Sequence, residues 1–243
     1  MHPDPTTSGG SPSLLLFPTR LERRRFLDQG GLRPGVALQE LSGFGPVAAA
    51  ARTAQLLAVL RPRRVLLLGI AGAYDIERHP IGSALEFSEV ALDGVGVGEG
   101  RGFRGPPAIG FPQWPGRPVR GQPDDGGDED LVGAVHDRLL LGAGGGEGLL
   151  LTTCAASASP AEAAVRLERF PEALAEDMEG FAVALACALE GVPLCIVRGI
   201  SNQVGVRDPA HWRIPAALAA ARRAALERLV AEDWGTTDGE ARR

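Results

Sequence analysis

Short apolar runs alternate along the chain with longer amphipathic or alanine-rich stretches. Apolar runs of a few residues bounded by turn residues are typical of buried strands, whereas longer stretches with helical periodicity predict helices. The pattern predicts strands at Leu14–Phe17, Val36–Leu41, Arg64–Gly69, Gly82–Leu92, Gly148–Thr153 and Pro193–Gly199. It predicts helices at Thr19–Asp28, Val47–Leu60, Glu129–Leu141, Pro160–Arg169, Glu179–Glu190 and Ile214–Glu232.

Strands and helices therefore alternate, which predicts an α/β fold. We expect a single-domain three-layer α/β/α arrangement with a central mixed, mostly parallel sheet, spanning residues 14–235. Residues 1–13 are polar and rich in Pro, Ser and Gly, and we interpret them as a disordered leader. Residues 94–127 are dense in Gly and Pro and predict a long loop or insertion, and residues 236–243 a flexible tail.

Composition narrows the classes of function. The 243 residues include 44% apolar side chains, enough for a sizeable core, and the formal net charge of -5 argues against nucleic acid as a partner. The leader lacks the pattern of a signal peptide, and Leu14–Phe17 is too short to cross a membrane. Cys154, Cys187 and Cys195 form no CxxC pair and show no metal-ligand spacing. We therefore predict a cytoplasmic protein with reduced thiols and no metal site.

Two glycine-containing segments follow predicted strands, where ligands of parallel α/β sheets bind. The segment Gly43–Pro46 precedes a predicted helix and offers free N–H groups, although an ordinary tight turn explains it equally well. The segment Gly69–Gly72 contains small residues that leave room for a flat or sugar-like ligand. Helix–strand packing explains its glycines equally well.

Two further segments carry polar side chains. Glu179 follows Met178 and enters an apolar helix; its carboxylate can accept the two hydrogen bonds of a ribose diol, and the methionine suits the apolar face of the sugar. A carboxylate at a helix start and a methionine in a core are the structural alternatives. After the next strand, Ser201 and Asn202 can read the edge of a purine or simply cap a helix.

The joint order of these segments is more specific than each segment alone. GFGPVAAA, LLLGIAGAY, AEDMEGFAVALAC and VPLCIVRGISN together resemble the nucleoside phosphorylase and nucleosidase superfamily. The resemblance covers most of the chain outside the leader and residues 94–127. It implies a nucleoside phosphorylase-like fold, cleavage of a purine-nucleoside N-glycosidic bond without a cofactor, and a homo-oligomer.

The resemblance also implies roles for individual residues. Met178 and Glu179 would bind ribose, with Ala71 and Gly72 beneath the sugar. Asn202 would contact the purine at N7 and the six-position substituent, next to Ser201. The stretch Thr153–Ser157 resembles the loop that holds the base through backbone groups, which implicates Ala156 and Ser157.

Two positions favour water over phosphate as the nucleophile. Phosphorylases of this superfamily typically carry an arginine and a serine where this chain has Leu67 and Ile70, and neither of these side chains can bind an anion. The N-terminal glycine-rich phosphate motif is also absent, since the segment reads Phe17–Glu22. In the related nucleosidases a glutamate at the position of Glu22 prepares the water. A solvated surface glutamate in a run of arginines is the alternative.

The residue Asn202 also bears on the base. In adenine-specific relatives an aspartate occupies this position, whereas an amide can donate to a carbonyl O6 and accept from N7–H. This favours a 6-oxopurine such as hypoxanthine. On the 5′ side of the ribose we expect Trp212 and Phe44, with Arg207 or Arg213 as a cation for an anionic 5′ group; a core anchor is the alternative for the tryptophan.

Several alternatives stay open at this point. The protein could be a general 6-oxopurine nucleosidase or phosphorylase acting on inosine, or a nucleosidase for 6-aminopurine substrates such as methylthioadenosine, against which Asn202 argues. A non-catalytic nucleoside-binding protein would keep the same pocket. Replacing Glu22 by Gln distinguishes an enzyme from a binding protein.

Overall fold

The computed structural model describes residues 11–30, 32–33, 35–118, 131–142, 146–231 and 234. Most of the predicted leader, residues 119–127 of the Gly/Pro-rich segment and the predicted tail 236–243 lie outside the described residues. No helix among the described residues is long and apolar enough to cross a membrane.

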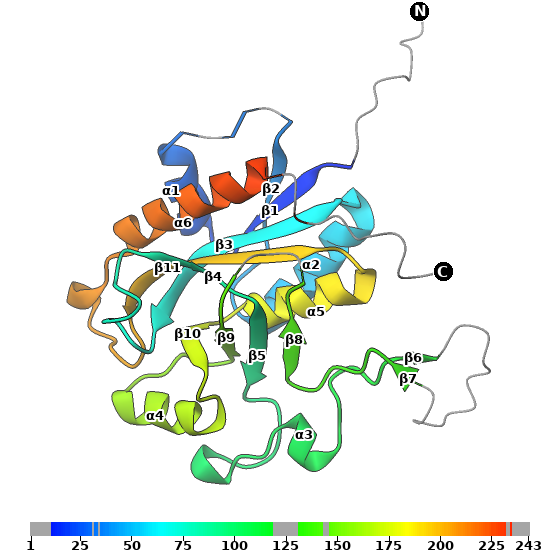
Figure 1. The fold of residues 1–243 in the computed structure, drawn as a ribbon, viewed down its shortest axis with the longest axis vertical. Helices are drawn as coiled ribbons and strands as arrows, with labels where there is room; N and C mark the ends of the chain where they lie inside the picture. The colour runs from blue at the N-terminus through cyan, green and yellow to red at the C-terminus, as the bar shows by residue number, and fades with distance from the viewer. Residues whose placement is uncertain are drawn as a thin grey trace, which may run out of the picture.

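A mixed sheet forms the centre of the molecule (Figure 1). Its strands are β1 (Ser13–Phe17), β2 (Ala37–Leu41), β3 (Arg64–Ala73), β4 (Ala84–Glu86), β5 (Glu89–Asp93), β8 (Arg138–Leu140), β9 (Leu149–Thr153), β10 (Ala173–Asp177) and β11 (Leu194–Gln203). The order is β2-β1-β3-β10-β9-β5-β8, and β11 pairs with β3 and β4. Neighbouring strands are parallel except in the pairs β3–β10, β4–β11 and β5–β8, which confirms the predicted mixed, mostly parallel sheet.

Helices cover both faces of this sheet, as predicted. They are α1 (Arg20–Asp28), α2 (Pro46–Leu60), α4 (Pro160–Arg169), α5 (Gly180–Glu190) and α6 (Ile214–Val230). Because successive strand residues point to opposite faces, Leu14 and Leu16 pack with α2 and α5, whereas Leu15 and Phe17 pack with α1 and α6. Two separate apolar layers follow from this alternation. Figure 1 shows α1 and α6 on one face of the sheet and α2 and α5 on the other.

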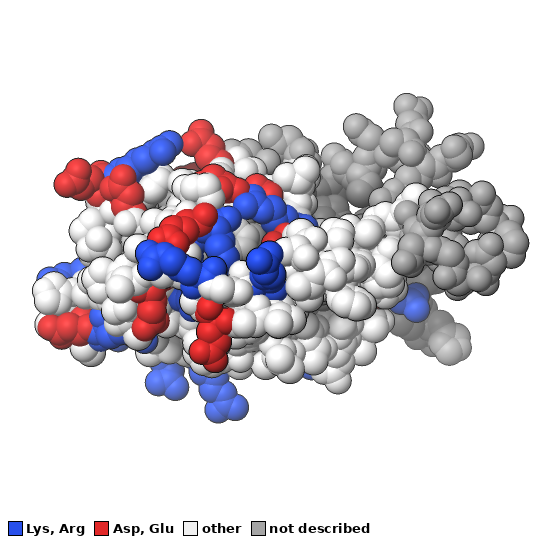
Figure 2. Space-filling model, turned by 90° about the horizontal axis from the view of Figure 1, so that it is seen from below, with Lys and Arg blue, Asp and Glu red and all other residues white. Residues whose placement is uncertain are grey.

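The segment after β5 has little regular structure up to residue 118. It contains only the 3-10 turn η1 (Gly100–Gly102), the short helix α3 (Pro106–Ile109) and β6 (Arg117–Pro118), which pairs with β7 (Leu131–Val132). The face at the bottom of Figure 1, where α3 and α4 lie, carries intermingled arginine and acidic side chains (Figure 2).

The helix predicted at Glu129–Leu141 is wrong. Residues 131–132 form β7, and residues 138–140 form β8, which adds to the sheet edge antiparallel to β5. Gly133 has a φ of 76°, which a right-handed helix cannot contain. Pairing of Leu139 with Val90 gives the apolar residues a partner that the isolated helix would lack.

Other boundaries also differ from the prediction. The expected strand Gly82–Leu92 is divided into β4 and β5, with Phe87 buried at the break. Both β3 and β11 continue four residues beyond their predicted ends, to Ala73 and Gln203, because they pair with each other over most of their length. The strand β10 was not predicted, since ALAED carries neither β-branched nor aromatic residues.

Candidate active site

A cavity of about 240 Å³ lies at the ends of β3, β10 and β11. All but one of the predicted site residues line it: Glu22, Phe44, Ala71, Gly72, Ala156, Ser157, Met178, Glu179, Ser201, Asn202, Arg207 and Trp212. The exception is Arg213, whose guanidinium donates instead to the carbonyls of Ala210 and Trp212. Ala71, Gly72, Ser201 and Asn202 lie within the extended strands rather than after them.

One edge of β3 has a gap between its partner strands. Strand β1 pairs with β3 from Arg64 to Leu67, and β10 pairs with it at Gly72 and Ala73. Within the gap, the Ile70 N–H donates to Oε1 of Glu22 at 3.1 Å. The sheet thus leaves space for side chains where the two partners separate.

The carboxylate of Glu22 is fixed in this gap. Its Oε2 accepts from the Thr19 N–H at 2.9 Å and from the Thr19 hydroxyl at 2.6 Å, and Thr19 caps α1 in return. This capping box follows from the sequence spacing T-x-x-E. Glu22 is only 4% exposed, so the alternative of a solvated surface glutamate is wrong.

A fully buried arginine stands beside Glu22. Arg198, on β11, donates through Nη2 to Asp177 at 2.5 Å and lies 3.4 Å from Oε2 of Glu179. Its Nη1 and Nε have no hydrogen-bond partner among the described residues. An arginine with free donors inside a protein is costly unless a ligand or water accepts from them.

The position of Arg198 explains Gly69. A Cβ added to Gly69 would lie 2.1 Å from Nη1 of Arg198 and 2.7 Å from Oε1 of Glu22. The missing side chain therefore makes room for these two groups, rather than for the ligand that the sequence also suggested. Gly72 lies similarly against Val204 and the Nδ2 of Asn202.

The carboxylate of Glu179 lies just before α5. Its Oε1 accepts from the Gly45 N–H at 3.0 Å. Burial raises the pKa of Glu179 from 4.5 to about 7, with Asp177 and Glu22 adding to the rise and Arg198 opposing it. The site thus gathers three buried carboxylates around one guanidinium.

Asn202 owes its position to an irregularity in β11. The register with β3 shifts between Ile200 and Asn202, which re-aims the strand's side chains. The Asn202 Oδ1 accepts from the Ser201 hydroxyl at 2.8 Å, and Nδ2 donates to the Gln203 carbonyl at 2.8 Å. Because that carbonyl can only accept, it fixes which end of the amide carries the NH₂. One amide hydrogen and one Oδ1 lone pair stay available.

The mouth of the cavity is apolar and cationic. The Arg207 guanidinium stacks 5.0 Å from the ring centroid of Trp212, whose Nε1 donates to the Val206 carbonyl. Phe44 is 66% exposed at the cavity. Both Arg207 and Trp212 also line a neighbouring cavity with Pro209, Ile214 and Pro215.

Sequence reasoning missed Arg198, Asp177 and Glu176 as site residues. A signal was present in the strand Pro193–Gly199, where Arg198 is the only charged residue of an otherwise apolar run. A buried arginine requires acidic partners, and the acidic pair before Met178 was the available source. The local sequence does not reveal that these groups meet, because β10 and β11 lie on either side of β3.

Comparison with known proteins identifies the class. Residues 30–231 match the phosphorylase superfamily. The chain therefore belongs to the phosphorylase superfamily.

Within that superfamily, particular relatives are similar over most of their length. The futalosine hydrolase of Thermus thermophilus is 36% identical over 91% of this chain and 96% of its own. The 5′-methylthioadenosine/S-adenosylhomocysteine nucleosidase of Chromohalobacter salexigens is 30% identical over 80% of this chain and 79% of its own. The solved futalosine hydrolase of Helicobacter pylori shares the fold, with a TM-score of 0.65 and 17% identity over 90% of this chain and 97% of that one.

Proposed function

We propose that this protein is a futalosine hydrolase. It cleaves the N-glycosidic bond of futalosine with water and releases hypoxanthine and dehypoxanthine futalosine, a step of menaquinone biosynthesis. The observation that carries this proposal is the set of buried carboxylates of Glu22, Asp177 and Glu179 around Arg198. The similarity to futalosine hydrolases supports the choice of substrate.

The charge of this set favours water over phosphate. Three carboxylates and one guanidinium leave the inner cavity with an excess of negative charge when all are ionised, which repels a phosphate dianion. Leu67 is buried in the apolar core, and Ile70 offers the cavity an aliphatic side chain. Neither can replace the arginine and serine that phosphorylases use.

The roles in the reaction follow from the contacts. The carboxylate of Glu179 accepts hydrogen bonds from the two ribose hydroxyls, and the Met178 side chain packs against the sugar. Glu22 takes a proton from the attacking water, and the free Nη1 of Arg198 donates to the water oxygen. As the bond from the anomeric carbon to the base stretches, the water oxygen bonds to that carbon. The base takes up a proton at N7 from solvent, and Glu22 returns its proton to solvent, so that one water is divided between the two products.

The purine is held at the other end of the cavity. The free hydrogen on Nδ2 of Asn202 donates to the carbonyl O6, and the free lone pair on Oδ1 accepts from N7–H of the departing base. Ser201 holds the amide through its hydroxyl. Ala156 and Ser157 contact the base through the backbone, and Ala71 and Gly72 lie under the ribose.

The 5′ group of the substrate extends toward the mouth. Futalosine carries a benzoate on this side, and Arg207 is the cation that lines the cavity there, whereas the Arg213 guanidinium is bound to carbonyls. Trp212 and Phe44 offer aromatic surface to the benzoate. Replacing Arg207 by Met is expected to raise KM for futalosine about tenfold while leaving inosine unaffected, because only futalosine carries the anion. Equal effects on both substrates would contradict this role.

We also propose that the protein acts in the cytoplasm as a homo-oligomer. The three cysteines are free thiols. Phe44 and the neighbouring Val47, which is 83% exposed, offer apolar surface beside the cavity on which a second copy could pack.

The mechanism is tested by tracing the oxygen that reaches the sugar. Futalosine is incubated with the protein in ¹⁸O-labelled water, with and without inorganic phosphate, and the mass of the sugar product is measured by mass spectrometry. Hydrolysis predicts one heavy oxygen in the product and no sugar phosphate in either buffer. A sugar phosphate that forms only with phosphate present would contradict hydrolysis and support the inosine phosphorylase alternative.

A further inference from the structure

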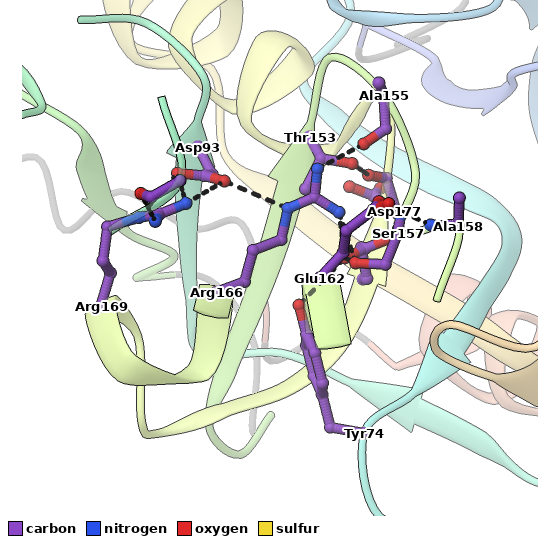
Figure 3. Close-up of polar contacts among 12 residues, drawn as sticks. Tyr74, Asp93, Thr153, Ala155, Ser157, Ala158, Glu162, Arg166, Arg169 and Asp177 are labelled. Carbon is purple, nitrogen blue, oxygen red and sulfur yellow. Dashed lines mark hydrogen bonds and ion pairs between the residues drawn. The ribbon is translucent and has the colours of Figure 1, made fainter. Parts of the chain in front are cut away.

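A loop between β9 and α4 forms one wall of the cavity. Its residues 154–159 belong to no helix or strand, yet Ala156 and Ser157 line the cavity. Two groups outside the loop hold its residues 155–157, and Glu162 on α4 accepts from the Ala158 N–H at 2.9 Å. Arg166, on α4, donates from Nη2 to the Ala155 carbonyl at 2.6 Å, and its Nη1 contacts the Ser157 hydroxyl (Figure 3).

The second group is the carboxylate of Glu176, on β10. Its Oε1 accepts from the Ser157 N–H at 2.7 Å, and its Oε2 accepts from the Ser157 hydroxyl at 2.7 Å. Oε2 also accepts from Nη1 of Arg166 and from the Tyr74 hydroxyl, both at 3.0 Å. Four hydrogen bonds therefore converge on this buried carboxylate, and its capacity for further donors is largely used.

The other side of Arg166 is held as well. Its Nε donates to Asp93 at 3.1 Å, and Asp93 is also bound by Arg169 (Figure 3). Two arginines and two carboxylates thus balance in charge in a part-buried network in which Glu176 and Asp93 are almost fully covered. Removing one member leaves the partners buried without a counter-charge, so the arrangement is stiff.

The network has a consequence for Ser157. Both of its donors are used within the protein, so Ser157 can offer a ligand its carbonyl but neither its N–H nor its hydroxyl hydrogen. The contact of Ser157 with the base therefore depends on the position of the loop backbone. That position is set by Arg166 and Glu176.

We propose that Arg166 and Glu176 are positioning residues that set the selectivity for the base. The inference rests on the proposed function, because it takes the loop to be the wall at the base. The two residues fix the Ala155–Ser157 backbone relative to the Asn202 amide and occupy the Ala155 carbonyl and the Ser157 N–H, which leaves the Ser157 carbonyl for the base. The N1–H of a 6-oxopurine can donate to this carbonyl, whereas N1 of a 6-aminopurine cannot. Arg166 does not line the cavity, and the Glu176 carboxylate is bound by Ser157, Arg166 and Tyr74.

The test compares Arg166→Met with the matched control Arg169→Met. Both arginines lie on α4 and bind Asp93, but only Arg166 reaches the loop. The ratio of kcat/KM for the wild-type protein's best substrate to that for its 6-amino or 6-oxo counterpart is measured for each. A misplaced wall is expected to lower that ratio about tenfold or more in Arg166→Met, mainly through KM. Arg169→Met is expected to keep the wild-type ratio.

Two more variants guard against a loss of folding. Glu176→Gln keeps the shape and one acceptor for the Ser157 N–H, but its NH₂ would face the donors of Tyr74 or Arg166, so the ratio should fall here too. Arg166→Lys keeps a charge for Glu176 without bridging to Ala155, and should restore stability more than selectivity. An unchanged ratio in both Arg166→Met and Glu176→Gln, or an equal fall in Arg169→Met, would overturn the proposal. Because the ratio refers to whichever base the wild type prefers, failure to cleave futalosine would refute the proposed function separately.

Discussion

Replacing Gly69 by Ala tests the packing at the centre of the site. The added Cβ would stand 2.1 Å from Nη1 of Arg198 and 2.7 Å from Oε1 of Glu22, and 3.2 Å from the Pro18 side chain. Nη1 would have to retreat by about 1.3 Å to reach ordinary contact at 3.4 Å. The guanidinium is tied to Asp177, and the Glu22 carboxylate is tied to Thr19. The guanidinium cannot move without breaking a buried hydrogen bond, nor the carboxylate without breaking a part-buried one.

Two effects follow from this displacement. Over-packing of a well-filled interior costs about 1–3 kcal/mol of unfolding free energy. Displacing groups beside the attacking water by about 1 Å lowers turnover about a hundredfold. The fall should appear in kcat more than in KM, because the Glu179 contact with Gly45 is not disturbed directly.

The assay pairs steady-state kinetics with urea unfolding, and circular dichroism verifies the folded fraction. Gly102→Ala is the control, because a Cβ there meets nothing within 4 Å and an exposed substitution of this kind changes stability by less than about 0.5 kcal/mol. Wild-type kcat and stability in Gly69→Ala would refute the close approach of Arg198 and Glu22 to this backbone, and with it their joint role.

Three further predictions concern the chemistry of the same site. Glu22→Gln should lower kcat about 10²- to 10⁴-fold while substrate binding by calorimetry stays intact, since the base is lost but its shape is kept; full activity would exclude Glu22 as the base. Because the pKa of Glu179 is raised to about 7, kcat/KM should rise as pH increases toward that value. Over the same interval this group's contribution to stability should fall, since the folded state holds the proton more tightly than the unfolded chain; a flat pH profile below pH 7 would contradict the assigned ribose contact. Asn202→Asp should reduce kcat/KM for a 6-oxopurine nucleoside about ten- to hundredfold relative to its 6-amino analogue; an unchanged ratio would show that this residue does not read the base.

Much of the fold could be predicted because the strands β1, β3, β9 and β11 are short apolar runs that carry their own signal. The starts of two helices also carry a local signal, since Thr19 caps α1 and Pro160 occupies the first turn of α4. The helix prediction for Glu129–Leu141 was wrong because residues 138–140 pair with β5 and because Gly133 has a positive φ. Local propensity cannot reveal such a tertiary contact.

Some residues of the candidate site could likewise be predicted from the sequence and others could not. Residues that stand in recognisable motifs, such as Glu179 and Asn202, were found from the sequence. The network of Tyr74, Glu176 and Arg166 was not, since its members come from β10, α4 and the segment after β3 and share no sequence pattern. The role of Gly69 was likewise hidden, because only the approach of Arg198 from another strand explains it.

The most direct test of the central claim is release of free base by the purified protein in phosphate-free buffer, with futalosine, inosine, aminofutalosine and methylthioadenosine compared at equal concentration. Rapid hypoxanthine release from futalosine, with little cleavage of the other three, is the predicted result. Preferential cleavage of the 6-amino substrates would contradict the role of Asn202, and cleavage of inosine only after phosphate is added would contradict hydrolysis itself.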